Sequence, residues 1–249
     1  MEHAGLLFGA GLLAGTMNAV AGGGSFVTFP AMIAAGLPSV SANASSTVAL
    51  CPGSLASAWA YRDDFVPFEG VAMRALIAVS LAGGLLGALL LLLTPSATFD
   101  RIVPWLLLVG TLTFAFGRRA SVYLRRLARI GPRTMIVAQF ALGLYGGYFG
   151  GAVGIMMMAT WSLLGIHDLK ALNAAKTLLS GVMNSIAVAC FVVAGKVWWP
   201  ETLVMLLAAV VGGYVGAQVG RRVDQRWLRP AISLLCFAIT AAFFLRARP

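Results

Sequence analysis

Long apolar runs recur from one end of the chain to the other, and they restrict its fold more than any other feature. They span 4–20 with 24–36, 42–61, 71–93, 101–116, 134–149 with 152–165, 171–194, 201–219 and 228–245. Most approach the ~20 residues that a helix needs to cross ~30 Å of hydrocarbon. We therefore predict an all-α polytopic membrane protein, expected in a bacterial-type cytoplasmic (inner) membrane.

The composition supports this class and excludes others. Hydrophobic residues make up 60% of the 249 residues and charged residues only 10%, whereas a soluble domain has roughly 25% charged residues. The net charge of +10 does not indicate a nucleic-acid partner, because most cations lie in two short loops between apolar runs. The sequence has two histidines and no carboxylate pair or metal-ligand cluster, so we predict no enzyme, metal or cofactor.

Two of the apolar regions are too long for one helix, and glycines interrupt both of them. The interruptions lie at residues 21–24 and 150–154. The pieces of 13–17 residues that flank them are short for full spans. We predict that each region is a Gly-broken, re-entrant helical hairpin.

The two halves of the chain resemble each other. Sliding the sequence by 129 residues places 83–88 on 212–217, and a slide of 130 aligns the helices that follow the hairpins. Matched pairs are Gly22 with Gly151, Gly36 with Gly165, Asn43 with Asn173 and Thr47 with Thr177. We therefore predict a first repeat half, 1–116, a basic cytoplasmic linker, 117–133, and a second half, 134–249, within one membrane domain.

The distribution of Lys and Arg distinguishes two topologies. If each broken region crosses the membrane once, 11 of the 18 cations are cytoplasmic and the basic loop 221–229 faces outside. If each region returns to its own side and three spans follow, 13 cations lie inside and four outside. The second topology agrees better with the positive-inside rule. It makes the halves inverted repeats, a common plan of secondary transporters, with both termini outside.

Polar residues inside the spans are the candidates for function, because burying them in lipid is costly. The run 171–194 carries one stripe, and the run 42–61 carries the matching one. The stripes contain Asn173, Lys176, Thr177, Ser180 and Asn184, and Asn43, Ser46, Thr47 and Ser54. We interpret Lys176 as a counter-charge for an anionic substrate; the alternative is a lysine that snorkels to the interface. For the asparagines the alternatives are capping and interhelical hydrogen bonding.

Glycine breaks within a membrane expose backbone N–H groups at the start of a half-helix, where they bind anions. The alternative is that glycine only lets helices pack closely. The predicted substrate-binding residues are Gly22, Gly23, Gly24, Ser25, Asn43, Ser46, Thr47, Gly150, Gly151, Gly154, Asn173, Lys176, Thr177 and Asn184.

These same motifs resemble the sulfite exporter TauE/SafE family of membrane permeases. The resemblance rests on residues 21–30 and 42–47, on 145–155, and on the stretch from Asn173 through Lys176 to Asn184. It covers almost the whole chain and implies transport, commonly export, of sulfite, sulfonates or related organosulfur anions. The second half departs from the pattern, since it lacks the proline and has Ala152-Val153 where the first has Gly23-Gly24. We therefore expect the two hairpins to contribute unequally.

The leading hypothesis is a secondary transporter, an exporter, of such a small anion by alternating access between the two halves. The alternative is a passive anion channel, and a structural scaffold is a third class. Its predicted partners are the anionic substrate and the lipid bilayer. The sequence leaves open the coupling ion, H⁺ or Na⁺, and whether the protein forms a homodimer.

Overall fold

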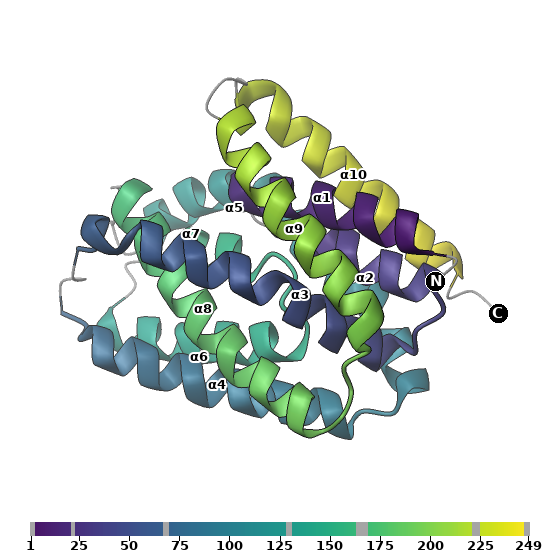
Figure 1. Ribbon diagram of the computed structural model, residues 1–249. Coiled ribbons are helices and arrows are strands. Elements are labelled where there is room, and N and C mark those ends of the chain that lie inside the picture. Colours follow the sequence, from purple (N-terminus) through teal and green to yellow (C-terminus); the bar gives the residue numbers. More distant parts are fainter. Residues whose placement is uncertain are drawn as a thin grey trace.

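The computed structural model describes residues 3–20, 23–66, 70–127, 131–162, 169–220 and 225–246, and every regular element in these ranges is helical (Figure 1). The prediction of an all-helical chain is confirmed for them. The elements are α1 (Ala4–Val20), α2 (Ser25–Ala34), α3 (Ser39–Ala60), a 3₁₀ turn (Arg62–Asp64), α4 (Met73–Leu93), α5 (Ser96–Leu127), α6 (Pro132–Tyr148), α7 (Val153–Ser162), α8 (Leu169–Val193), α9 (Trp199–Gly220) and α10 (Gln225–Arg246).

Both long apolar regions are broken where glycines interrupt them. In each, a helix of 17 residues is followed by a helix of 10 residues. A residue with a left-handed backbone precedes the second helix of each region: Gly23 (φ +89°) lies two residues before α2, and Ala152 (φ +59°) lies directly before α7. These positions differ by the 129 residues of the repeat offset. A left-handed residue at this place redirects the chain into the helix that follows.

Four helical segments are long and apolar enough to cross a membrane: Met73–Leu93, Ser96–Gly117, Ala171–Val193 and Trp199–Gly216. Shorter apolar helices include Ser25–Ala34 and Val153–Ser162. Helix α5 exceeds the predicted span 101–116, because it continues through the basic residues to Leu127. Charge ends an apolar span, but arginine and leucine are good helix formers. The first part of the predicted basic linker is therefore helical.

Glycines bring two pairs of helices into backbone contact. Helix α1 packs along α9, and α4 packs along α6. A Cβ added at Gly212 would meet the Leu12 carbonyl oxygen, and one at Gly83 would lie 2.6 Å from the Phe140 carbonyl oxygen. Such close approach requires small residues. Gly83 and Gly212 match under the 129-residue offset, and so do the helix pairs to which they belong.

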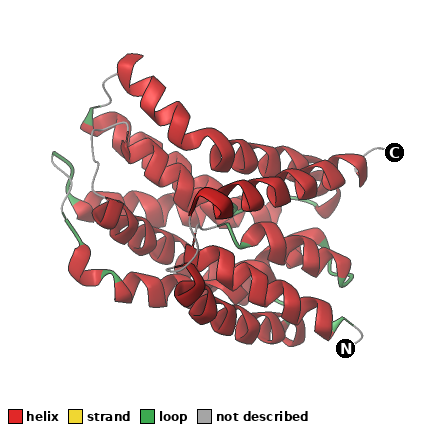
Figure 2. Ribbon diagram, turned by 90° about the horizontal axis from the view of Figure 1, so that it is seen from above, coloured by secondary structure: helices red, strands yellow, loops and turns green. Residues whose placement is uncertain are grey.

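Helices α5 and α10 form a further contact between matching elements. The Thr111 and Thr240 hydroxyls are 2.9 Å apart and are separated by 129 residues in sequence. Near the other end of the pair, the rings of Trp105 and Phe244 meet edge to face at 5.1 Å, so the two helices run antiparallel. The start of α1 and the end of α10 lie at the same end of the molecule (Figures 1 and 2).

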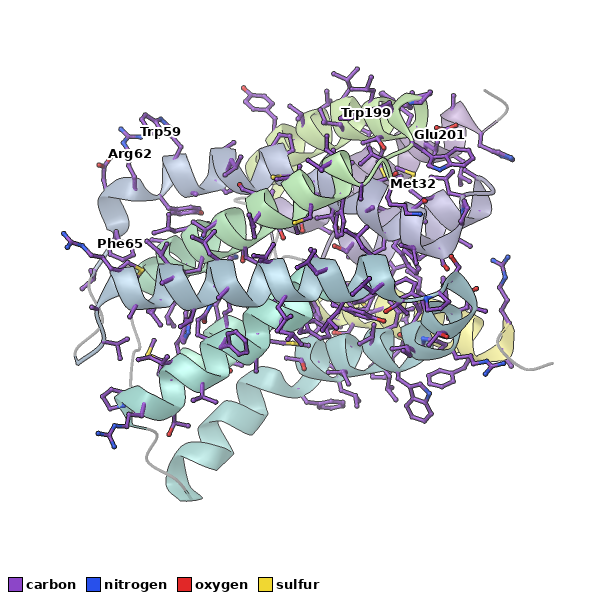
Figure 3. The ribbon with its side chains drawn as sticks, turned by 90° about the horizontal axis from the view of Figure 1, so that it is seen from below. Met32, Trp59, Arg62, Phe65, Trp199 and Glu201 are labelled. Carbon is purple, nitrogen blue, oxygen red and sulfur yellow. The ribbon has the colours of Figure 1, made fainter. Side chains whose placement is uncertain are left out.

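Exposed tryptophans mark both ends of the molecule. Trp59, next to Arg62, lies at one end, and Trp199 lies at the opposite end (Figure 3). Trp59 is 71% exposed and Trp199 48% exposed. Tryptophan is enriched at the two interfaces of a membrane, so the long axis between these residues is the direction in which the helices would cross a bilayer.

Candidate functional site

The second glycine break leaves a row of backbone amides without acceptors. The N–H groups of Phe149 and Gly150 both donate to the Tyr145 carbonyl, at 2.9 and 3.3 Å. The next N–H groups to find an acceptor are those of Ile155 and Met156, which donate to the Ala152 carbonyl. The amides of residues 151–154 donate to no acceptor in the described part of the chain. Unpaired amides at a helix start, reinforced by the helix dipole, form an anion-binding feature.

Lys176 lies directly beside these amides. Its side chain crosses the first turn of α7, because a Cβ added at Gly154 would be 3.0 Å from the Lys176 Cδ and 3.1 Å from its Cγ. Glycine at position 154 therefore makes room for the lysine stem. No acidic side chain in the described residues is within ion-pair distance of Lys176. The structure thus places the one cation of the predicted stripe next to a helix start, with no counter-ion from the described part of the chain.

The first glycine break is occupied by the protein's own side chains. The Gly24 amide donates to the Asn18 Oδ1 at 2.8 Å. The hydroxyls of Thr28 and Ser46 hydrogen-bond to each other, and both side chains are buried. Two predicted substrate ligands, Gly24 and Ser46, therefore already have partners within the chain.

The other predicted residues of the first break, where described, form no hydrogen bond to a side chain. Gly23 supplies the left-handed turn, and Ser25 is the half-buried first residue of α2. Gly22 lies outside the described residues.

Asn43 connects the first half to the second break. Its Nδ2 donates to the Tyr148 carbonyl oxygen at 3.0 Å, at the end of α6, and the side chain is buried. The Thr47 hydroxyl donates back to the Asn43 carbonyl at 2.9 Å within α3. Asn43 therefore holds the break in place through a hydrogen bond of its own, as the interhelical alternative in the sequence predicted.

Aromatic contacts also bring the two breaks together. The rings of Phe29 and Phe149 have centroids 5.8 Å apart. A Cβ added at Gly110 of α5 would be 2.7 Å from the Phe26 ring and 3.4 Å from the Ala152 Cβ. Helix α2 and the second break thus meet around one point on α5, in the buried core.

The other α8 residues differ in their relation to this region. The Thr177 hydroxyl donates to the carbonyls of Asn173 and Ala174 in its own helix. Asn173 is half-buried, and its side chain has no hydrogen-bond partner in the described residues. Asn184 lies eight residues beyond Lys176, about 12 Å along a helix. Gly150 takes part through its left-handed backbone, φ +77°.

Some polar residues with structural roles were absent from the predicted set. Gln139 donates to the Ser80 hydroxyl at 2.8 Å and accepts from the Trp161 indole at 3.2 Å, which ties α7 to α6 and α4. Asn18 and Thr28 were also missed. An isolated amide within an apolar run is itself a signal, because it needs a partner in lipid.

An acidic group was missed as well. The Glu201 Oε2, in the first turn of α9, is buried and has no hydrogen-bond partner among the described residues. Glu201 lies at the end of the molecule opposite Arg62 (Figure 3). One carboxylate oxygen is therefore buried where the candidate span Trp199–Gly216 begins.

Comparisons with known proteins agree with the resemblance found in the sequence. The family model described as "Sulfite exporter TauE/SafE" matches residues 7–243. No solved structure matches the chain.

Three bacterial relatives cover nearly the whole chain. The "Probable membrane transporter protein YfcA" of Escherichia coli (strain K12) is 30% identical over 239 residues, which are 95% of this chain and 88% of the relative. A "Probable membrane transporter protein" of Haemophilus influenzae is 31% identical over 240 residues, 95% and 92% of the two chains. The "Probable membrane transporter protein ORF9" of a Sinorhizobium species is 30% identical, over 94% and 89%. This multi-pass membrane protein therefore belongs to the sulfite exporter TauE/SafE family of transporters.

Proposed function

We propose that the protein is a secondary transporter that binds a small oxyanion at the second glycine break. The observation that carries this proposal is the row of unpaired amides at 151–154 beside the Lys176 side chain. The amides supply several N–H donors within four consecutive residues, and the lysine supplies a positive charge beside Gly154. Charge-assisted hydrogen bonds of this kind are roughly twice as strong as neutral ones.

The substrate class follows from this donor set. Several donors at one helix start suit an anion with several oxygens on one centre, such as sulfite or a sulfonate. The family description, "Sulfite exporter TauE/SafE", agrees with this class and supports export as the direction. The half-buried side chain of Asn173 on the same helix is one turn from Lys176 and is a further candidate donor.

We propose alternating access between two inverted halves, 1–116 and 134–249, in a bacterial cytoplasmic membrane. Matching helices make matching contacts, α1 with α9 and α6 with α4, and the Thr111–Thr240 pair joins positions 129 residues apart. Each broken region is a short helix pair rather than a full span, which supports a re-entrant hairpin. In this arrangement the end of the molecule that carries Arg62 faces the cytoplasm.

Counterflow in proteoliposomes tests the transport mechanism. Vesicles that contain purified protein are loaded with unlabelled sulfite and diluted into a trace of radiolabelled sulfite. A transporter that carries the anion through alternating states will accumulate label transiently above equilibrium. A channel with the same lining will let the label equilibrate without an overshoot, and that result would contradict the proposal.

A further inference from the structure

We propose that only the second glycine break binds an anion. In the first half, the Asn18 side chain occupies the position that the substrate takes in the second half. This inference rests on the proposed function and adds the number of sites and the residue that sets it. Each chain then binds one anion, although it contains two glycine breaks of the same build.

The geometry at the first break is that of a bound acceptor. Gly24 is the N-cap residue directly before α2, and its N–H donates to the Asn18 Oδ1 at 2.8 Å. A Cβ added at Gly24 would be 3.0 Å from both Cγ and Oδ1 of Asn18, so the carboxamide sits over the start of the helix. A carboxamide oxygen is a neutral acceptor with the geometry of one oxyanion oxygen.

The matching position in the second half carries no side chain. Under the 129-residue offset Asn18 corresponds to Gly147. Position 147 has no room for a side chain, because an added Cβ would collide with the carbonyl oxygen of Gly84 on α4. The second half therefore has nothing equivalent to Asn18 to cover its amides, and those of residues 151–154 remain unpaired in the described chain.

The residue that matches Lys176 in the first half is uncharged and already has a partner. Ser46 matches Lys176 under the offset of 130 residues, and its hydroxyl is paired with Thr28. The second half has Met157 where the first has Thr28. Ser46 and Thr28 of the first half thus bond to each other, whereas Lys176 of the second half carries a charge and has no ion-pair partner among the described residues.

Counting bound anions tests the inference. Calorimetric titration of the full-length protein in detergent with sulfite should give one binding event. Asn18→Ala removes the internal acceptor and should give two, the new one about tenfold weaker because it has no lysine. Asn18→Asp keeps an acceptor oxygen at Gly24 and should still give one. Should Asn18→Ala fail the size-exclusion check for folding, Asn18→Gly reproduces the residue at 147 and carries the same expectation.

Lys176→Gln separates this inference from the proposed function. It should weaken the single event of the parent by about thirtyfold, and combined with Asn18→Ala it should leave the new event at the first break as the tighter of the two. If folded Asn18→Ala binds one sulfite with the parent's affinity while Lys176→Gln weakens that binding, the role of Asn18 is wrong and the proposed function stands. If the parent binds no sulfite, sulfate or small sulfonate, the proposed function fails.

Discussion

The two glycine breaks share one backbone plan and differ in what their donors contact. Each joins a 17-residue helix to a 10-residue helix, and each turns at a left-handed residue, Gly23 or Ala152. At the first break the Gly24 amide donates to Asn18. At the second, the amides of 151–154 have no acceptor in the described chain, and the Lys176 stem crosses Gly154.

This difference shows how a duplicated framework acquires one site instead of two. The backbone turn tolerates the change from Gly23 to Ala152, so the departure seen in the sequence leaves the break intact. The side chains around the turn decide whether its amides face protein or substrate. Four substitutions test this comparison.

The largest effect is expected where the second break is packed against α4. In Gly147→Ala, the new methyl group would collide with the Gly84 carbonyl oxygen, and α6 and α4 would have to separate. Overpacking of this kind costs about 3 kcal/mol, equivalent to about 6–10 °C in the apparent Tm. Thermal unfolding of purified protein measures it. Gly9→Ala is the matched control, because nothing lies within 4 Å of its Cβ position; equal losses in the two variants would contradict the packing argument.

Anion affinity should depend on the lysine of one half only. Lys176→Gln removes the charge at the second break and should weaken sulfite binding by about 2 kcal/mol, or about thirtyfold. Ser46→Ala, at the matching position of the first half, removes only a hydroxyl that is bonded to Thr28 and should leave affinity unchanged. Titration of both variants measures the difference. If Lys176→Gln binds like the parent, Lys176 is an interfacial anchor and the site is wrongly assigned.

A smaller effect is expected from displacing that lysine without removing it. In Gly154→Ala, the methyl group would lie 3.0 Å from the Lys176 Cδ, so the stem must shift by a few tenths of an ångström. Because charge-assisted hydrogen bonds depend on position, we expect about five- to tenfold weaker sulfite binding. Ser25→Ala changes the matching residue of the first half and should have no effect. An unaltered affinity in Gly154→Ala would show that the lysine does not act from this position.

The smallest effect concerns the shared turn itself. Gly23→Ala places a side chain at φ +89° and should lower stability by about 1 kcal/mol. The reciprocal change, Ala152→Gly, relieves strain but adds chain entropy to the unfolded state, so the net change should stay within about 0.5 kcal/mol. Melting temperatures of the two variants test whether the breaks are equivalent in backbone. A large loss in Ala152→Gly would show that they are not.

The helices and breaks could be predicted from the sequence because they follow from local patterns. Apolar runs define where helices form, and a glycine cluster within such a run defines where one breaks. Positions that the 129-residue offset matches also meet in the structure, as the Thr111–Thr240 pair illustrates, although no such contact was predicted. Helix ends were less accurate, and α5 continues well past its predicted span because helix formation does not stop at a charge.

The pairing of polar groups could not be predicted in the same way. The Asn18–Gly24 hydrogen bond spans a turn whose direction no local pattern specifies, and the Thr28–Ser46 contact depends on how α2 packs against α3. Because neither hydrogen bond can be read from the sequence, Gly24 and Ser46 were predicted as substrate ligands, whereas in the structure both have partners within the chain. Lys176 and Gly154 were predicted as parts of one site, and the structure does bring them into contact.

Locating a bound oxyanion tests the central claim most directly. Selenate is a suitable probe, because anomalous scattering identifies selenium. Protein with ordinary methionine contains no selenium, so the signal in its crystals comes from the bound anion alone. The account predicts one selenium peak per chain, within hydrogen-bond distance of the amides of residues 151–154 and of the Lys176 Nζ, and none at Gly24. A peak at the first break alone, or one distant from Lys176, would contradict it.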